Sequence, residues 1–312
     1  MSKIFEALTR ADGEPASSLL PDLIGPEDAA APRAAEQSLP ATPVVVDTAP
    51  APVRSQAPPA VAPVPAAGLR MDRIRTLSLQ VPQTAPVLPF DDTHWQASER
   101  YRMIRTKILQ HPRKPRMIVV SSPGSGDGKS VTAINLAGAL SLKTTSNVLL
   151  MDGDFRRATI HRQIGFSHTP GLAEVLEGTC ALEDALVHTE QFPALYVLPA
   201  GDQKANPAEL LDSPQWQSLT ERVRSAFEYI IVDSPPIAAV ADYDLIMAAC
   251  DGVVLVARPD HTNRTLCFKA LETLPKEKLL GVILNCTSNW FLPGKGQYDS
   301  YYYRAPKEFR GR

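Results

Sequence analysis

The sequence is poor in cysteine, in aromatic residues and in long apolar runs. Four cysteines occur among 312 residues and none forms a CxxC pair, which argues against a disulfide framework or a cysteine metal site. No run reaches the roughly 18 apolar residues that a membrane span requires, and no secretory signal is visible at the start. The net charge of -2 disfavours a general nucleic-acid or anionic-membrane binder. These absences favour a cytosolic protein with reduced thiols and no nucleic-acid partner.

Proline, in contrast, is abundant and concentrated near the start of the chain. Fifteen of the 29 prolines precede Asp91, interleaved with alanine and few aromatic residues. Such a composition buries too little apolar surface to offset the entropy of ordering, so residues 12–90 are predicted to be a disordered or extended linker. Residues 1–11 carry a Ser2 cap and apolar positions at helical spacing, which indicates a short amphipathic docking helix. A frayed terminus explains the same residues equally well.

Residues 91–288 have the pattern of one compact α/β domain. Short apolar runs without polar alternation are separated by helical patterns, which predicts a mostly parallel, doubly wound sheet that is buried on both faces. The last stretch, 289–312, is polar and aromatic and is predicted to be a flexible tail. The expected strands are Met117–Ser121, Val148–Met151, Leu195–Leu198, Tyr229–Val232, Val253–Ala257 and Leu280–Leu284, and helical patterns cover Val131–Leu142, Gly171–Glu177 and Gln215–Ser225.

A glycine-rich loop follows the first of these strands and precedes a helix, which is the context of a Walker A phosphate-binding loop. Glycines let successive backbone N–H groups turn toward phosphate oxygens, and the helix N-terminus adds a positive end. The strict pattern has glycine where this chain has Pro123, and a glycine-rich turn without phosphate is the alternative. The predicted nucleotide-binding residues are Gly124, Ser125, Gly126, Asp127, Gly128, Lys129 and Ser130, with Lys129 on the β- and γ-phosphates and Ser130 on Mg²⁺.

Two acidic motifs stand at the ends of predicted strands. Asp152 and Asp154 follow one apolar run and Asp233 follows another. Ligands of open α/β sheets bind at the carboxyl ends of the strands, and a carboxylate there can hold Mg²⁺. A single aspartate at a strand end is more often a turn or cap residue. Three of them in a chain with a phosphate loop favour a metal site, with Asp233 in the Walker B position.

Together the three motifs resemble the cytoplasmic catalytic domain of bacterial tyrosine kinases of the capsule and exopolysaccharide type. The match comprises the loop at 121–130, the run Val148–Arg156 and the run Ile230–Pro235. Related septum-positioning and partition ATPases usually carry a signature lysine where this chain has Gly124, which favours the kinase branch. The resemblance covers about residues 91–303 and implies a P-loop NTPase fold that uses ATP and Mg²⁺.

Two features outside the loop support the same resemblance. Glu99, Arg102 and Arg105 match the family's Glu-x-x-Arg-x-x-Arg oligomerisation motif, although a solvated charged helix face has the same pattern. Four of the eight tyrosines lie in the last 15 residues. The resemblance implies that these tyrosines are the phosphoacceptors, although aromatic tails also dock to partners. They are Tyr298, Tyr301, Tyr302 and Tyr303.

The resemblance also implies roles and partners. Lys129, Asp152, Asp154 and Arg156 become the catalytic residues, with Asp152 accepting the phenolic proton and Arg156 orienting the incoming chain. Ser130, Asp154 and Asp233 become the Mg²⁺ ligands. The chain would phosphorylate its tail in trans within a homo-oligomeric ring, would be reset by a tyrosine phosphatase, and would be recruited to the inner face of the plasma membrane by a separate transmembrane activator or polysaccharide co-polymerase.

Two other functions remain open at this stage. A cargo-positioning P-loop ATPase of the partition type would use the same motifs as a switch, without phosphotransfer. A nucleotide-locked scaffold of the export machinery would use its Pro-rich segment to recruit partners, and Pro123 leaves room for weak catalysis. The Gly124 position and the tyrosine-rich tail count against the partition-type ATPase, whereas Pro123 leaves the scaffold open.

Overall fold

The computed structural model describes residues 69–81, 95–143, 147–204, 206–237 and 240–287. The predicted docking helix at 1–11, most of the predicted linker and the predicted tail at 289–312 lie outside the described residues. Among the residues that are described, no helix combines the length and the apolarity needed to cross a bilayer.

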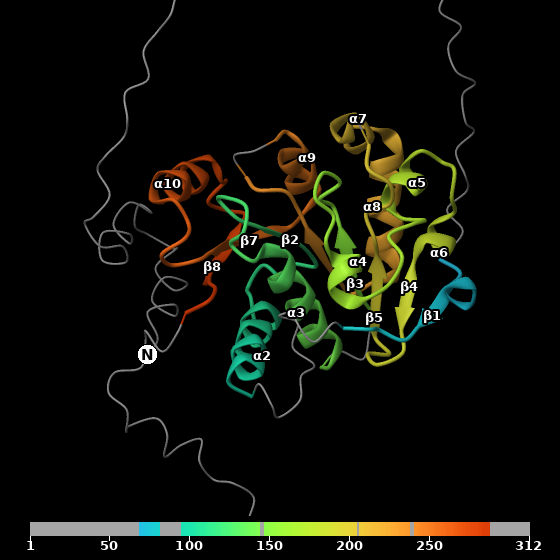
Figure 1. The fold of residues 1–312 in the computed structure, drawn as a ribbon, viewed down its shortest axis with the longest axis horizontal. Helices are drawn as coiled ribbons and strands as arrows, with labels where there is room; N and C mark the ends of the chain where they lie inside the picture. Colours follow the sequence, from blue (N-terminus) through green and yellow to red (C-terminus); the bar gives the residue numbers. More distant parts are fainter. Residues whose placement is uncertain (1–68, 82–94, 144–146, 205, 238–239, 288–312) are drawn as a thin grey trace, which may run out of the picture. The chain divides into compact units, whose positions relative to one another are not determined.

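The framework is an eight-stranded sheet in the order β1-β4-β5-β3-β6-β2-β7-β8 (Figure 1). All neighbouring strands are parallel except β4 and β5, which confirms the predicted α/β fold with a mostly parallel sheet. The strands are β1 (Arg75–Leu77), β2 (Met117–Ser121), β3 (Val148–Asp152), β4 (Val187–Thr189), β5 (Leu195–Leu198), β6 (Tyr229–Asp233), β7 (Gly252–Ala257) and β8 (Leu279–Leu284).

Helices cover both faces of this sheet, as expected for central strands with apolar side chains on both faces. The described helices are the 3-10 turn η3 (Met71–Arg73), α2 (Trp95–Leu109), α3 (Lys129–Ser141), α4 (Ile160–Ile164), α5 (Leu172–Leu176), α6 (Leu182–Ala185), α7 (Pro207–Leu211), α8 (Pro214–Ala226), α9 (Asp242–Ala249) and α10 (Arg264–Thr273).

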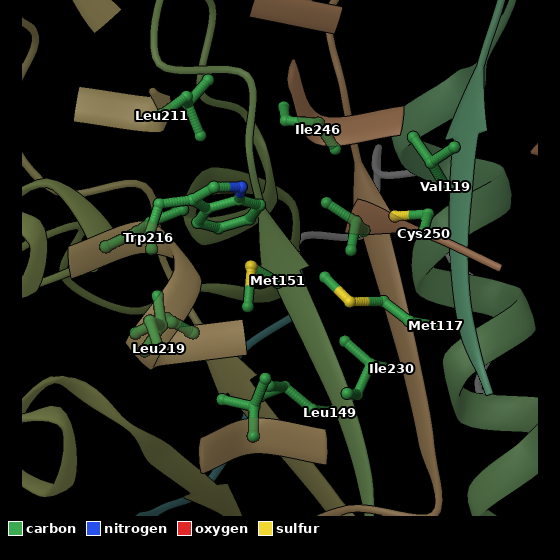
Figure 2. Packing of buried hydrophobic residues seen from close by; sticks show 14 of the residues in the cluster. Met117, Val119, Leu149, Met151, Leu211, Trp216, Leu219, Ile230, Ile246 and Cys250 are labelled. Carbon is green, nitrogen blue, oxygen red and sulfur yellow. The ribbon is translucent and has the colours of Figure 1, made fainter. Parts of the chain in front are cut away.

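The alternation of side chains along each strand divides the interior into two cores. On β2, Ile118 and Val120 pack in the core that includes α3 and Ile108 of α2. Met117 and Val119 point into the opposite core, which includes residues of α8, α9 and α10. Figure 2 shows the second core, where Trp216 of α8 lies beside Met151 of β3. With both faces buried, the carboxyl ends of the strands are the sheet's natural place for a ligand.

Residues 69–81 correct the predicted domain boundary. The sequence pattern placed them in a disordered linker that ends at residue 90, but β1 forms the edge of the sheet in parallel register with β4, with Arg75 opposite Val187. Ile74 is buried in the core, and the N–H of Arg70 donates to Glu183. A three-residue strand with polar neighbours has no distinctive sequence pattern, because its stability comes from the partner strand and from one buried side chain.

Candidate functional site

The loop between β2 and α3 takes a conformation that only glycine adopts easily at two positions. Gly126 and Gly128 have φ angles of 88° and 91°, in the left-handed region. A Cβ atom on Gly128 would collide with the side-chain amide of Asn285, which follows β8. β2 lies between β6 and β7, so this loop is at the carboxyl ends of central strands, where α/β proteins bind ligands.

The Asp127 side chain holds the loop closed from inside. Its Oδ2 accepts a hydrogen bond from the N–H of Gly124 at 3.2 Å, and its Oδ1 accepts one from the Thr262 hydroxyl at 2.6 Å. The amide of Asn285 donates to the Asp127 carbonyl oxygen at 3.0 Å. Asp127 is therefore buried, and its carboxylate orients the loop. The predicted contribution of Asp127 to nucleotide binding can come from its backbone.

Lys129, the first residue of α3, connects the loop to the acidic motifs. Its Nζ donates to Asp154 Oδ2 at 2.8 Å and to the Ser130 hydroxyl at 3.4 Å, and it lies 3.8 Å from Asp233 Oδ1. Asp152 and Asp233 end the neighbouring strands β3 and β6 and are paired in register. The three predicted aspartates, the lysine and the serine thus lie together, as the strand-end argument requires.

The site concentrates negative charge in a buried place, which shifts the affinity of its groups for protons. Burial, together with the charge of Asp233, raises the pKa of Asp152 well above its usual range. Burial likewise raises the pKa of Asp233, against the opposing effect of Lys129. Burial alone would lower the pKa of Lys129, but Asp233 and Asp154 outweigh it and raise the pKa above the ordinary value. Lys129 is therefore a fixed positive charge among carboxylates that need a cation.

Asp233 is buried and only weakly compensated. Its carboxylate oxygens have no hydrogen-bond partner among the described residues, and Lys129 forms an ion pair with it at the long distance of 3.8 Å. A buried carboxylate without hydrogen bonds is costly, and hard oxygen donors such as carboxylates and hydroxyls suit Mg²⁺. Among the described residues, no group of three or more acidic, histidine or cysteine side chains is placed to hold a metal ion alone. This donor set fits a Mg²⁺ ion held jointly by a few protein oxygens and by phosphates.

Asp152 is held by the backbone at the end of β3, whereas Arg156 is held by the side chain of Asp242. The Oδ1 and Oδ2 atoms of Asp152 accept hydrogen bonds from the backbone N–H groups of Asp154 and Ile160, each at 3.2 Å, which fixes the carboxylate at the end of β3. Arg156 is half exposed and donates from two guanidinium nitrogens to the buried Asp242 at the start of α9, at 2.8 and 3.3 Å. Asp242 therefore orients the arginine beside the site.

The Glu-x-x-Arg-x-x-Arg motif lies on α2, and its residues make contacts within the chain. Glu99 and Arg102 form a half-exposed ion pair at 3.2 Å one turn apart. Arg105 donates to the carbonyl oxygen of Ala139 on α3 at 3.1 Å. The tail tyrosines 298, 301, 302 and 303 lie outside the described residues.

Sequence reasoning missed Thr262, Asn285 and Asp242, which position the loop and Arg156. Asn285 had a usable signal, because it follows an apolar strand directly, as Asp233 ends one. Thr262 follows β7 by five residues and had no such signal. Asp242 opens a helix, where an aspartate is ordinarily interpreted as a favourable charge near the N-terminus.

Comparisons with known proteins show which families and structures this chain resembles. Residues 115–269 match a family model described as an AAA domain. The chain is 38% identical over 192 residues to the tyrosine-protein kinase YwqD of Bacillus subtilis, and the aligned region covers 60% of this chain and 80% of YwqD. It is 33% identical over 209 residues to the tyrosine-protein kinase CpsD of Streptococcus agalactiae, and that alignment covers 66% of this chain and 90% of CpsD. The crystal structure of the VpsO kinase domain is similar with a TM-score of 0.56 and 30% identity, covering 62% of this chain and 100% of that one.

Proposed function

Because the chain belongs to the family of bacterial tyrosine-protein kinases, we propose that it transfers the γ-phosphoryl group of ATP to tyrosines of its own C-terminal tail. The transfer takes place between neighbouring copies in a ring and regulates the synthesis and export of an exopolysaccharide or capsule. The observation that carries the proposal is the position of Lys129, directly after a glycine loop. Its Nζ lies 2.8 Å from Asp154 and 3.8 Å from Asp233, whose buried carboxylate has no hydrogen-bond partner among the described residues.

The chain's own residues supply most of the positioning that phosphoryl transfer needs. Lys129 and the N–H groups of residues 124–130 bind the β- and γ-phosphates. Ser130, Asp154 and Asp233 would hold Mg²⁺, which when bound would neutralise charge on the phosphate oxygens. The high proton affinity of Lys129 keeps it charged through the reaction.

Asp152 accepts the proton of the attacking tyrosine. The phenolic O–H bond breaks toward the carboxylate, the phenolic oxygen bonds to the γ-phosphorus, and ADP leaves with the bridging oxygen. A free tyrosine has a pKa near 10, so a base with a raised pKa is better matched to it than an ordinary carboxylate. Burial, with Asp233 beside it, raises the pKa of Asp152 in this sense. Arg156, held by Asp242, orients the incoming tail.

The partners follow from the same proposal. Glu99, Arg102 and Arg105 pair across the subunit boundary of the ring. A transmembrane activator or polysaccharide co-polymerase recruits the chain to the inner face of the plasma membrane, and a tyrosine phosphatase resets the tail. Each phosphorylation adds about -1.5 to -2 charges, so several on one tail repel neighbouring copies and loosen the ring.

Phosphotyrosine formation in the purified chain with Mg-ATP and a cytoplasmic fragment of the activator tests the proposal. We expect Lys129→Met, and a variant with the four tail tyrosines replaced by phenylalanine, each to lose the phosphotyrosine signal. Lys269→Met, on the exposed side of α10, and Tyr229→Phe, outside the tail, are the matched controls and should retain it. ATP hydrolysis without phosphotyrosine in the wild type, or full signal in the tail variant, contradicts the proposal.

A further inference from the structure

A basic pocket of about 400 Å³ is lined by the residues that directly follow Asp154 in the chain. The segment that runs from the end of β3 through α4 forms one side, and Gly201 and Gln203 after β5 contribute to the other. Its lining includes Arg156, Arg157, Arg162, His161 and His168, and none of the lining residues that the structure describes is acidic. A volume of this size is in the range of pockets that bind small ligands.

Only part of this positive charge is neutralised by the protein. Arg156 is paired with Asp242, and His168 Nε2 lies 3.3 Å from Asp202. Arg162 donates to a backbone carbonyl oxygen, that of Ala158, at 3.2 Å. The Arg157 guanidinium makes no hydrogen bond or ion pair with any described residue. Arg157 and Arg162 are both exposed, so two guanidinium groups at the pocket have no negative partner within the described part of the chain.

His161 and His168 extend the basic lining of the pocket. The His161 ring lies against that of His168, with centroids 5.1 Å apart. Burial, and the charges of His168 and Arg162, lower the pKa of His161. An anion in the pocket would offset this repulsion.

The pocket is directly connected to the candidate active site through the backbone. Phe155, which begins the lining, follows Asp154, and the N–H of Arg157 donates to Asp154 Oδ1 at 3.0 Å. A ligand held by Arg157 is therefore within a few residues' reach of the γ-phosphate position.

We propose that the pocket binds a phosphotyrosine of a neighbouring copy's tail while the next tail tyrosine is phosphorylated. The proposal rests on the proposed function. Guanidinium groups bind phosphate through paired, charge-assisted hydrogen bonds. The tail carries four tyrosines between positions 298 and 303, and three extended residues span about 10 Å. One phosphorylated tyrosine can therefore anchor the chain while its neighbour reaches Asp152, which makes successive phosphorylations faster than the first.

Binding of a tail peptide tests the pocket without requiring catalysis. The probe is a peptide of residues 295–306 with phosphotyrosine at position 301, titrated by fluorescence anisotropy into the full chain saturated with Mg-ADP. We expect the double variant Arg157→Ala/Arg162→Ala to bind it at least about tenfold more weakly than the wild type. The unphosphorylated peptide should bind much more weakly to both proteins.

The control removes the same charge elsewhere. Lys269→Ala/Lys276→Ala takes two exposed lysines from α10 and the segment after it, and should bind the phosphopeptide as the wild type does. Equal affinity of the pocket variant and the wild type, or equal weakening in the lysine control, overturns the proposal. Binding that Mg-ADP abolishes also overturns it, because the peptide then occupies the nucleotide site.

Intact-mass spectrometry of the autophosphorylation time course gives the second measurement. We expect the wild type to pass quickly from one phosphate to several, and the Arg157→Ala/Arg162→Ala variant to accumulate the singly phosphorylated form. If the variant reaches the multiply phosphorylated forms at the wild-type rate, successive anchoring is wrong although autophosphorylation of the tail stands. If no tail phosphate forms in the wild type while the phosphopeptide still binds, the proposed function fails independently.

Discussion

Gly128 joins the phosphate loop to the helix that begins with Lys129, and its surroundings leave no room for a side chain. Its φ angle of 91° is strained for any other residue, and a Cβ there meets the Asn285 amide that donates to Asp127. A substitution therefore breaks a hydrogen bond that shapes the loop. The effect on nucleotide binding comes through the backbone, because Gly128 has no side chain to contribute.

Gly128→Ala is expected to destabilise the fold by more than the ~1–2 kcal/mol that a left-handed alanine costs, and to weaken nucleotide affinity at least tenfold. Gly178→Ala is the matched control, since Gly178 has a φ of 74° and a Cβ atom added to it would meet nothing within 4 Å. It should show the backbone strain alone and bind nucleotide normally. Urea unfolding and titration with a fluorescent ADP analogue measure both effects, and identical behaviour of the two variants would contradict the collision argument.

The secondary-structure elements show what a sequence can and cannot reveal about this fold. Six strands were predicted within a residue or two, because a strand buried on both faces is apolar at every position. β1 and β4 were missed because each has three residues with polar side chains among them, and their pairing is a tertiary effect. The strand-end aspartates were predictable for the same reason. Each one ends an apolar run, and the end of that run marks the carboxyl end of a strand.

The residues that position the site were less predictable than the residues of the site itself. Asp242 and Thr262 act on Arg156 and Asp127 across 86 and 135 residues of sequence, and nothing in their local pattern indicates those contacts. Likewise, the basic pocket combines residues of α4 with Gly201 and Gln203, which only the fold brings together.

At the scale of elements, Asp251 joins β2, α8 and the turn before β7. Its Oδ2 accepts from the N–H groups of Arg116 and Met117, both at 2.8 Å, and it pairs with Arg224 of α8 at 2.8 Å. Burial opposes its charge, but the hydrogen bonds from Arg224 and from the two N–H groups outweigh burial and lower the pKa of Asp251. A lowered pKa means that the carboxylate stabilises the fold above its unfolded pKa, and that this stabilisation is lost as the pH falls.

Asp251→Asn is therefore expected to lower the free energy of unfolding by ~1–3 kcal/mol at pH 7. The difference from the wild type should begin to shrink below the unfolded pKa of about 4, and should disappear only as the pH falls through the lower folded-state pKa of Asp251. Glu221→Gln, an exposed acidic residue on the same helix α8, should leave stability nearly unchanged across this pH range. Urea unfolding at pH 7 and at a series of pH values below about 4 measures this, and a loss that stays constant across the whole series would show that the charge is unimportant.

For the molecule as a whole, the boundary of the folded domain lies earlier than composition indicates. β1 pairs with the edge of β4, and Leu69 and Met71 pack against the core that contains Ile74. An uncovered strand edge presents free N–H and C=O groups to other chains. Residues 69–81 therefore cover the edge of β4.

This gives a prediction about truncation. A chain that starts at residue 91, the boundary that composition suggests, loses β1 and the burial of Ile74. Its free energy of unfolding should be ~2–4 kcal/mol lower than that of a chain that starts at residue 69. Ile74→Ala in the full chain should reproduce a large part of that loss, whereas Thr76→Ala, on the exposed side of the same strand, should cost little. Urea midpoints and light scattering are the measurements, because exposure of the β4 edge should also promote association. Equal stability and equal scattering of the two truncated chains would mean that β1 adds nothing to the sheet, and that the domain begins at α2.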